Sequence, residues 1–583
     1  MEKVWQVRPK IDNDFIIKNP GFSRVVLQLL FNRGLKDKKE IEQFFNSSSG
    51  DFFDPFLFNN MATAVDLIIK HIKAEDKIVI YGDYDADGVT STAILAQVLT
   101  ILKAKIEIYI PDRASEGYGL NKKAIDEFIK NNLKLIITVD GGIRDKNEVE
   151  YAKASGLDII ITDHHVSPEE KDLPDCLIIN PNVAGENYPF KNLAGAGVAA
   201  KLAEAIISRA KLPKEIKEKL REQTLDLAAI GTIADCVSLL GENRILVKEG
   251  LKVVNKNKRM GLGELIKVAQ INGEIEEWNI GFQIAPRLNA AGRMEHANTA
   301  FELLTTKNKE EAETLSRRLN NRNIDRQRIT EEIMGEIEKK IEVGADPVRK
   351  STLSNGAREK IIIGVCPLRE EKEAEVWNEG VIGLVAGKLS DKYYRPVLVI
   401  TKGQEGYKGS GRSIPEFNII AALEEAREFL EKYGGHPAAC GFSLKEENLE
   451  NFIDKMKKLA EGKLNKTDLR PKLEIEAELA LEEIDEGLVK NLEKFSPFGQ
   501  DNPRPKFISR KAQIKDIINM GIDGQHVKFR FNGLWAVAFG RSEEWKKFKI
   551  GDKVDVVYYI ENNNFNGRSE VQLKLVDIKS HNA

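Results

Sequence analysis

The feature that most constrains the fold is a series of short apolar, β-branched segments that alternate with helix-compatible stretches between Lys77 and about Ala210. Parallel strands buried on both faces form nearly continuous Val, Ile and Leu runs, and a helical crossover usually joins them. The pattern therefore predicts an α/β domain with a mainly parallel sheet. The predicted strands are KIVIY (77–81), KIEIYI (105–110), KLIITV (134–139), DIIIT (158–162) and CLII (176–179).

The rest of the chain changes pattern several times. Apolar residues at three- or four-residue spacing predict a long connecting helix over 308–341, and a segment rich in Pro, Gly and Ser (345–360) precedes a new strand at 361–365. Many short strands broken by Gly, Asn and Asp turns follow residue 472 and predict a small β-barrel. We expect an N-terminal strap (1–75) whose aromatic cluster 52–58 packs on the next domain, a first α/β domain (76–215), a helical region with the long connecting helix (216–350), a second α/β domain (351–466) and a C-terminal β-barrel (467–583).

Charge and hydropathy exclude some classes of protein. The 88 Lys and Arg residues nearly balance the 91 Asp and Glu residues, so a nucleic-acid surface must be a local patch. No apolar run approaches the roughly 20 residues that span a bilayer, and the first residues lack the apolar core of a secretion signal. We therefore expect a cytoplasmic protein without membrane contact.

Three carboxylates follow the first predicted strand on one short turn. Asp83, Asp85 and Asp87 lie within GDYDADG (82–88), directly after KIVIY. Carboxylates this close repel one another, and a divalent cation is the usual remedy. Taken alone, the segment is also compatible with a calcium-type loop or a solvated acidic turn.

Other strand ends carry matching side chains. KLIITV is followed by Asp140, and DIIIT is followed by Asp163, His164 and His165. Because parallel strands end at the same edge of a sheet, these groups should converge with the acidic turn. The alternative, one buried and one surface histidine without a ligand, is weak beside these acidic strand ends. Asp235 ends an apolar helical run, where a carboxylate needs a charged partner or a metal.

The donor types narrow the choice of metal. The four cysteines are far apart and form no CxxC pair, which disfavours a thiolate site. Carboxylates with one or two imidazoles suit Mn²⁺ or Mg²⁺. Two such ions about 3.5–4 Å apart are used for hydrolysis of phosphate esters.

These motifs resemble the DHH phosphoesterase family in order and spacing. The similarity spans roughly residues 20–580 and is closest to the long members, which degrade single-stranded DNA in the 5′ to 3′ direction. In the first α/β domain and the helical region the resemblance rests on Gly82–Gly88, Val139–Gly142, Thr162–His165, Asn180–Asn182, Leu193–Val198, Ala234–Cys236 and Ala285–Met294. Gly380–Gly387, Gly409–Ser413 and Gly434–Gly441 are similar to the family's DHH-associated domain. The C-terminal strands stand where long members of the family carry an oligonucleotide-binding barrel. The resemblance therefore implies a DHH catalytic domain over 76–215 and an OB-type barrel over 467–583.

The resemblance implies a metal-dependent exonuclease of DNA repair and recombination that releases 5′-mononucleotides. It also implies two ions of Mn²⁺ or Mg²⁺. One would be held by Asp87, Asp140, His164 and Asp235, and the other by Asp85 with Asp140 as the bridge. Asp83 and His165 would act as catalytic neighbours, either ligating an ion or orienting water and moving a proton.

Phosphate-binding residues are implied as well. The terminal 5′ phosphate would contact Arg113, Ser410, Arg412 and His436, and the scissile or adjacent phosphates would contact Arg287, Asn289 and Arg293. The alternative for the second domain is that its glycines only form turns and Arg412 is a surface charge. A row of arginines at four-residue steps either follows the DNA strand or forms a solvated helix face paired with glutamates. These are Arg318, Arg322 and Arg326. Candidate stacking residues in the barrel are Phe529, Phe531, Trp535 and Phe539, of which at least half should pack in its core.

One position departs from the family. Where the family usually has Trp-His-Glu-Gly, this chain has Trp377, Asn378, Glu379 and Gly380. Asparagine keeps a hydrogen-bonding tip but cannot carry a proton. Little changes if the position only orients a strand, whereas the rate or its pH dependence changes if the position titrates.

Two other functions are compatible with part of the sequence. A phosphodiesterase for short oligonucleotides or cyclic dinucleotides needs neither the helical region nor the barrel. A replication scaffold without metals should have lost ligands that are all present here. Single-stranded DNA is therefore the expected partner, with a single-strand-binding protein and a helicase as further candidates.

Overall fold

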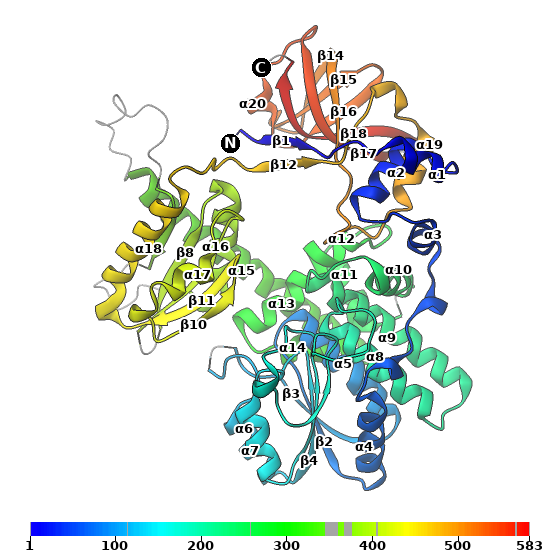
Figure 1. Ribbon diagram of the computed structural model, residues 1–583, viewed down its shortest axis with the longest axis vertical. Helices are drawn as coiled ribbons and strands as arrows, with labels where there is room; N and C mark the ends of the chain where they lie inside the picture. The colour runs from blue at the N-terminus through cyan, green and yellow to red at the C-terminus, as the bar shows by residue number, and fades with distance from the viewer. Residues whose placement is uncertain are drawn as a thin grey trace.

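The structure is a computed structural model that describes residues 2–113, 115–256, 258–343, 359–366, 376–403, 406–565 and 568–581. Two α/β lobes lie beneath a C-terminal β-barrel, and the long helix α15 (Lys309–Val343) runs from the first lobe to the second (Figure 1). This helix confirms the one predicted over 308–341. Most of the predicted boundary segment 345–360 lies outside the described residues.

The first lobe is built on a five-stranded, fully parallel sheet. Its order is β3-β2-β4-β5-β6, and every strand falls within one residue of its predicted bounds. Alternate residues face opposite layers: Ile78 and Ile80 pack with α4, α5 and α8, whereas Val79 and Tyr81 pack with α6 and α7. The elements are β2 (Lys77–Tyr81), β3 (Lys105–Tyr109), β4 (Leu133–Val139), β5 (Asp158–Thr162), β6 (Leu177–Ile179), α4 (Met61–Lys73), α5 (Ala86–Ile101), α6 (Lys122–Lys130), α7 (Lys146–Ala154) and α8 (Gly195–Arg209).

A helical layer extends the core of this lobe. Its helices bury one side of α5 and α8, which explains why α5 is buried nearly all round. Within the described residues, no helix has both the length and the apolar character needed to cross a bilayer. The layer comprises α9 (Lys214–Ala234), α10 (Gly241–Asn255), α11 (Met260–Val268), α12 (Glu277–Asn279), the π-helical turn η4 (Ile280–Ile284), α13 (Ala285–Met294) and α14 (Asn298–Thr305).

The second lobe has a mixed sheet of order β10-β11-β9-β8-β7, in which only β7 and β8 are parallel. Helix α16 covers one face, while α17 and α18 cover the other. The elements are β7 (Ile362–Val365), α16 (Glu379–Tyr393), β8 (Val397–Gly403), β9 (Gly406–Arg412), α17 (Ile419–Glu424), β10 (Lys432–His436), β11 (Ala439–Leu444) and α18 (Leu449–Leu464).

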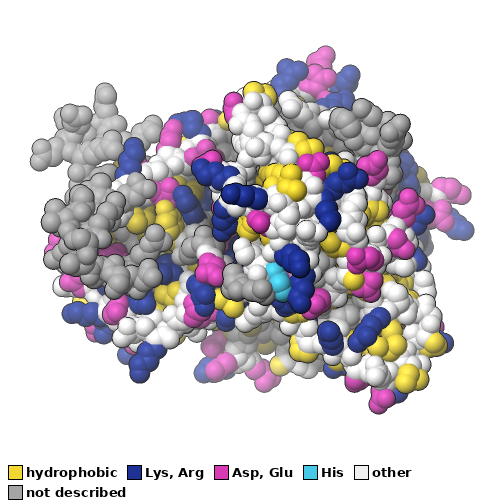
Figure 2. Space-filling view, turned by 90° about the horizontal axis from the view of Figure 1, so that it is seen from above, with side chains coloured by type: hydrophobic (Ala, Val, Ile, Leu, Met, Phe, Trp, Pro, Cys, Tyr) yellow, Lys and Arg dark blue, Asp and Glu magenta, His cyan; other side chains and the backbone are white. Residues whose placement is uncertain are grey.

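The C-terminal strands close into the predicted barrel. The order is β14-β15-β16-β18-β17, and β17 pairs back with β14. Phe529 and Phe531 lie in its core, whereas Trp535 is half-buried and Phe539 is exposed, so two of the four aromatic candidates remain accessible. The face seen from the barrel end carries clusters of Lys and Arg with apolar side chains between them (Figure 2). The elements are β13 (Ala477–Glu478), α19 (Glu486–Glu493), β14 (Phe507–Met520), β15 (His526–Phe531), β16 (Leu534–Ala538), α20 (Ser542–Trp545), β17 (Lys553–Phe565) and β18 (Arg568–Ser580).

The N-terminal segment packs in two places. The aromatic cluster 52–58 packs on the first lobe as predicted, with Phe58 buried in its core. The preceding residues pack on the C-terminal domain instead, an arrangement that the sequence did not indicate. There β1 (Val4–Val7) pairs with β12 (Lys472–Ile475), and α2 (Arg24–Asn32) shares the barrel core. The short helices α1 (Asn13–Lys18) and α3 (Lys38–Asn46) flank α2.

Arg33 joins the two ends of the chain. Its buried guanidinium donates from Nη1 to Glu476 (3.0 Å), from Nε to Asn502 (2.6 Å) and from Nη2 to the carbonyl of Pro503 (2.7 Å). Removing one partner of a buried, hydrogen-bonded pair leaves the other charge unsatisfied.

We expect Arg33→Ala to lower the free energy of unfolding by about 3–5 kcal/mol, because Glu476 then loses its buried partner. Arg8→Ala removes an exposed ion pair with Glu474 at the same junction and should cost less than about 1 kcal/mol. Denaturant titration of both variants checks this, and equal effects would contradict it.

Candidate metal centre and phosphate cleft

The acidic turn after β2 has its shape set by its own side chains. Asp85 caps the start of α5, its Oδ1 accepting hydrogen bonds from the amides of Asp87 (2.9 Å) and Gly88 (3.0 Å). Position 88 must be glycine, because a Cβ there would lie 2.5 Å from the carbonyl oxygen of Asp83. The turn therefore holds all three aspartates close together.

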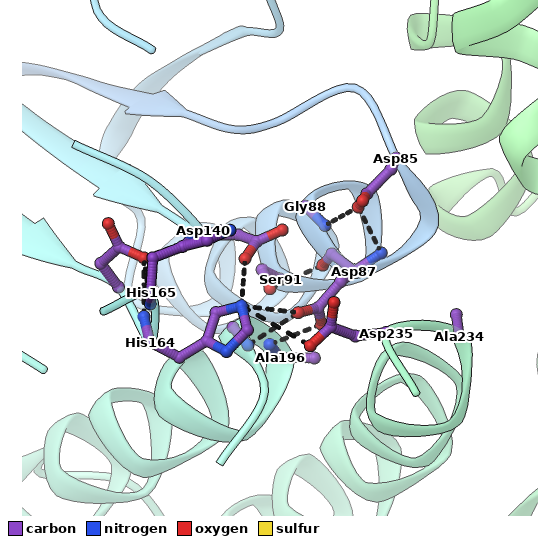
Figure 3. Close-up of polar contacts among 12 residues, drawn as sticks. Asp85, Asp87, Gly88, Ser91, Asp140, His164, His165, Ala196, Ala234 and Asp235 are labelled. Atoms are coloured by element: carbon purple, nitrogen blue, oxygen red, sulfur yellow. Dashed lines mark hydrogen bonds and ion pairs between the residues drawn. The ribbon is translucent and has the colours of Figure 1, made fainter. Parts of the chain in front are cut away.

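Asp87 also fixes the neighbouring helix. Its two carboxylate oxygens accept hydrogen bonds from the amides of Gly195 (2.7 Å) and Ala196 (2.8 Å), at the positive end of α8 (Figure 3). A Cβ at Gly195 would lie 2.5 Å from Oδ1 of Asp140, so glycine is needed for this approach. The helix can thus lie directly against the acidic cluster.

His164 lies at the centre of the cluster. Its Nε2 is 3.2 Å from Oδ1 of Asp140, 3.6 Å from Oδ2 of Asp235 and 3.9 Å from Oδ2 of Asp87 (Figure 3). Asp140 itself has a left-handed backbone, with φ of 61°. Strain of this kind is concentrated at functional sites.

Three groups of three residues could each hold a metal ion. Within each group, one potential ligand atom per residue lies within 4.8 Å of the other two, and the groups share residues. Asp140 belongs to two groups and His164 to two, which describes adjoining cation sites with common ligands. The groups are Asp83, Asp85 and Asp140; Asp87, His164 and Asp235; and Asp140, His164 and His165.

The electrostatics of these residues fit a divalent cation. Burial and then neighbouring carboxylates raise the pKa of Asp87 to about 7 and that of Asp235 to about 8, and they raise the pKa values of Asp83 and Asp140 well above the ordinary value. Burial and the charge of His165 lower the pKa of His164 to about 4, leaving it neutral. Oδ1 of Asp83, Oδ1 of Asp140 and Nε2 of His164 are buried and find no hydrogen-bond partner among the described residues. Carboxylates without a countercharge and acceptor atoms without a hydrogen-bond donor are suitable ligands for Mn²⁺ or Mg²⁺.

Asp163 is a functional residue to which sequence reasoning gave no role. Fully buried, it accepts hydrogen bonds from the amides of Ile143 (3.0 Å), His164 (2.7 Å) and His165 (3.0 Å), and its Oδ1 lies 2.8 Å from Nδ1 of His165. Burial opposes charge on both partners, yet their mutual hydrogen bond raises the pKa of His165 to about 9 and lowers that of Asp163. The available signal was its position at a strand end, beside the histidines.

Basic residues of both lobes line the cleft between them, Arg113 and Arg293 from the first lobe and Lys402 and Lys408 from the second. A cleft of about 770 Å³ between the lobes is lined by Arg113, Arg293, Asn378 and Lys408 among others. Burial, followed by the charges of Arg113 and Arg326, lowers the pKa of Arg293 to about 10. Clustered guanidinium groups favour an anion between them.

Arg412 and Ser410 lie under α16, on the face of β9 away from the α17 and α18 layer. A Cβ at Gly383 would lie 3.0 Å from Oγ of Ser410 and 3.5 Å from Nη2 of Arg412, so that glycine leaves space for both. Burial lowers the pKa of Arg412, and the charge of Arg113 adds to that effect. His436 occupies the same cross-strand row as Arg412, two strands away with Ala439 between them, and is exposed.

Other predicted phosphate ligands already have protein partners. Arg293 donates to the carbonyl of Gly380 (2.9 Å), and Arg287 donates to Asn320 (3.0 Å). Oδ1 of Asn289 accepts the amide hydrogen of Ala86 (2.7 Å), which ties α13 to the acidic turn. Asn289 therefore supports the metal loop, and only its amide nitrogen is left for a phosphate.

The arginine row on α15 divides into two kinds. Arg318 and Arg322 both pair with Glu295, as in the alternative of a glutamate-paired face. Arg326 is half-buried, its Nε has no hydrogen-bond partner among the described residues, and burial and Arg287 lower its pKa. Only Arg326 of the three thus lacks a carboxylate partner in the described structure.

Asn378, the departure from the family motif, caps α16. Its Oδ1 accepts the amide hydrogen of Gly380 (2.7 Å), an ordinary capping bond that requires no proton on the side chain.

Comparisons with known proteins agree with this geometry. Residues 77–232 match the N-terminal domain of the DHH family, 360–462 match the DHHA1 domain, and 475–577 match the RecJ OB domain. The fold and the metal centre thus define a DHH-type protein. The chain is 38% identical to the single-stranded-DNA-specific exonuclease RecJ of Bacillus subtilis, over 98% of this chain and 70% of that protein. It is 31% identical to the Thermus thermophilus exonuclease RecJ, over 89% of this chain and 71% of that protein.

A solved structure agrees as well. The crystal structure of Thermus thermophilus RecJ in complex with Mn²⁺ superposes with a TM-score of 0.81 at 27% identity, covering all of this chain and 80% of that one. The chain belongs to the RecJ family.

We expect the metal-free protein to lose stability as the pH rises from about 4 to 8. The folded pKa values of Asp87 (about 7) and Asp235 (about 8) exceed the ordinary 3.8, so the folded state holds protons that the unfolded chain releases. Thermal midpoints in chelator should therefore fall across this range. Added Mn²⁺ should raise them most at pH 8, where the ligands are ionised.

Asp140→Asn provides the control, because asparagine tolerates the left-handed backbone and removes one repelling charge. In chelator at pH 8 it should melt at or above the wild-type temperature and respond little to Mn²⁺. A wild-type midpoint that rises with pH in chelator, or a variant that responds fully to Mn²⁺, would contradict the assignment.

Proposed function

We propose that this chain is an exonuclease that degrades single-stranded DNA in the 5′ to 3′ direction and releases 5′-mononucleotides. The observation that carries the proposal is the pair of adjoining cation sites next to a cleft between two lobes, which Arg113, Arg293, Lys402 and Lys408 line in part. Curated relatives that are named single-stranded-DNA-specific exonucleases support it. A phosphodiesterase for dinucleotides is not favoured, because it needs no distant barrel.

The cations of this site are Mn²⁺ or Mg²⁺, both of which are present in structures of the Thermus thermophilus relative. One would lie among Asp87, Asp140, His164 and Asp235, and the other among Asp83, Asp85 and Asp140. When bound, they generate a nucleophile from water and offset charge on the phosphoryl oxygens.

His165 is suited to handle the proton of the leaving group. In the metal-free protein the hydrogen bond to Asp163 outweighs burial and raises the pKa of His165 to about 9, so the ring is protonated near neutral pH and its orientation is fixed. Release of a 5′-mononucleotide breaks the bond from phosphorus to the 3′ oxygen of the terminal nucleotide. We assign His165 the role of donating a hydrogen bond or a proton to that oxygen.

The phosphate-binding side chains account for the 5′ to 3′ direction of degradation. Arg113 from the first lobe, with Ser410, Arg412 and His436 from the second, would bind the terminal 5′ phosphate. Arg287, Asn289 and Arg293 would bind the scissile and following phosphates. Because these contacts address phosphates and not base edges, cleavage should not depend on sequence.

The organisation of the whole protein follows from this function. We propose the five segments 1–75, 76–215, 216–350, 351–466 and 467–583 as its functional units, with a role in DNA repair and recombination. A cytoplasmic location and binding to a single-strand-binding protein or a helicase stay predictions, which pull-down from cell extract and cell fractionation can test.

We expect Mn²⁺-dependent release of mononucleotides from the 5′ end of single-stranded DNA only. Time-resolved product analysis with 3′-labelled and 5′-labelled strands, and a duplex of the same sequence, checks this. Asp140→Asn should lower the rate at least 100-fold, since it alters a shared ligand. Hydrolysis of dinucleotides alone would contradict the substrate, and absence of all hydrolysis would favour a scaffold.

We expect Arg412→Gln to lower kcat/KM for 5′-phosphorylated strands by about 10- to 100-fold, the usual size of a lost hydrogen bond to a charged group. The same variant should change kcat/KM for 5′-hydroxyl strands much less. Arg427→Gln, an exposed arginine paired with Glu424 in the same lobe, is the control and should change neither. Equal losses on both strands would place Arg412 outside the 5′ phosphate site.

A further inference from the structure

Three consecutive side chains at the start of α10 are polar and buried. Glu242 is 2% exposed, Asn243 is 0% exposed and Arg244 is 3% exposed. None of the three belongs to the metal centre or lines the cleft between the lobes. Burial of such groups is costly unless they are hydrogen-bonded, so their partners show which parts of the chain they hold.

Asn243 bridges two loops. Its Nδ2 donates hydrogen bonds to the carbonyl oxygens of Asn192 (2.5 Å) and Ser238 (2.9 Å). Its Oδ1 is buried and has no hydrogen-bond partner among the described residues. A buried acceptor without a donor is unusual and calls for an explanation. The side chain is therefore placed to serve the two carbonyls, at the expense of its own oxygen.

Both loops lead to the metal centre. Ser238 comes three residues after Asp235, and Asn192 comes three residues before Gly195. The amide of Gly195 donates to Asp87 (2.7 Å), and Asp87 and Asp235 belong to one group of metal ligands and lie side by side (Figure 3). One loop thus starts at a ligand, and the other ends at the helix terminus that orients a second ligand.

The loop after Asp235 takes its course from contacts outside it. Cys236, the next residue, has a left-handed backbone with φ of 59°. A residue other than glycine keeps such a conformation only where its surroundings impose it. Two hydrogen bonds act on this loop from other elements, one from Asn243 to the carbonyl of Ser238 and one from the amide of Leu239 to the carbonyl of Gln500 (2.9 Å).

Glu242 fixes the first turn of α10 to the first lobe. Its Oε1 accepts a hydrogen bond from Nζ of Lys201 on α8, and its Oε2 accepts one from the hydroxyl of Tyr188 (2.6 Å). Both partners are buried as well. The turn that carries Asn243 is therefore tied to the same helix whose N-terminus orients Asp87.

Arg244 fixes the same turn on its other side. Its Nε donates to the carbonyl of Phe44 (2.9 Å), its Nη1 to that of Phe495 (2.8 Å) and its Nη2 to that of Lys494 (2.8 Å). The guanidinium also lies 3.9 Å from the centroid of the Phe44 ring. The first turn of α10 is thus held by buried bonds on two sides and gives Asn243 a fixed base.

We propose that Asn243 is a positioning residue of the metal centre. By binding the carbonyls of Asn192 and Ser238, it sets the spacing between Asp235 and the end of α8 that orients Asp87. This inference rests on the metal centre of the proposed function and adds to it a residue that is itself not a ligand. Hydrogen bonds behind the ligands fix their geometry, and losing one costs about 10- to 100-fold in metal affinity.

The test compares Asn243→Leu with Asn255→Leu in the full-length protein. Leucine has a similar branched shape and donates no hydrogen bond. Asn255 is the matched control, because its Nδ2 also donates to two carbonyls, those of Leu251 (3.0 Å) and Ile275 (2.9 Å). It lies twelve residues further along α10, or about 18 Å at 1.5 Å per residue.

Both variants should lower the thermal midpoint in chelator, because each loses buried or half-buried hydrogen bonds. Only Asn243→Leu should raise the dissociation constant for Mn²⁺, by about 10-fold or more. Titration at pH 8, with free Mn²⁺ measured by electron paramagnetic resonance well below the midpoint of each variant, separates metal affinity from stability. Asn243→Ser keeps one donor in a smaller side chain and should weaken binding less; it replaces the leucine variant if that one does not fold.

The choice of metal gives a second readout. Mg²⁺ requires near-ideal octahedral geometry. Relaxed spacing of the ligands in Asn243→Leu should therefore lower the rate of single-strand cleavage by a larger factor in Mg²⁺ than in saturating Mn²⁺. Asn255→Leu should leave the ratio of the two rates at its wild-type value.

The outcomes separate this inference from the proposed function. If the wild type binds no Mn²⁺, the metal centre and the role of Asn243 both fail. If it binds Mn²⁺ but cleaves no single-stranded DNA, the proposed function fails, and the binding titration still decides the role of Asn243. If both Asn243 variants bind Mn²⁺ like the wild type, or if Asn255→Leu weakens binding equally, the positioning role is refuted and Asn243 only stabilises the fold.

Discussion

The structure depends on the mutual repulsion of carboxylates that are packed into a dry edge of a parallel sheet. Asp83, Asp87 and Asp140 are nearly inaccessible to water, and their pKa values are raised by burial and by one another. Such a cluster is stable in its ionised form only with cations among its members. Hence the turns, helix ends and glycines around it are arranged to bring negative groups together.

The structure around the cluster also restricts the conformations of the ligand side chains. Asp85 caps α5, Asp87 caps α8, and Asp163 holds His165, so each is oriented by hydrogen bonds to the backbone or to a neighbouring ring. Second-sphere bonds of this kind fix ligand geometry before a metal binds. The same rigidity extends through Asn289, which fastens α13 to the acidic turn and so couples the phosphate-binding helix to the metal centre.

Much of this could be predicted from the sequence, for identifiable reasons. The bounds of the five strands in the first lobe were predicted to within one residue. This was possible because a run of β-branched residues between polar loops forms a strand through local sequence preference. The acidic and histidine residues were assigned to one edge because parallel strands end together. By contrast, the sequence did not indicate that the carbonyl oxygen of Asn289 accepts the amide hydrogen of Ala86, and it did not decide between the two alternatives for Arg318 and Arg322, which pair with Glu295. Those pairings depend on rotamers and on helices distant in sequence, which no spacing rule specifies.

The sequence alone determined the fold class, the edge at which the chemistry lies, the donor types and therefore the kind of metal, because these follow from periodicity and ligand chemistry. Tertiary structure decided what depends on long-range contact. It placed residues 2–46 on the C-terminal domain through β1 and α2, and it left Arg326 without a carboxylate partner within the described residues. It also left Trp278 and Phe282 in solvent at 55% and 69% exposure, although their residue types alone predict burial in a core. Whether an aromatic residue packs inside or faces a ligand is set by which surfaces the remaining chain covers, and only the folded structure contains that information.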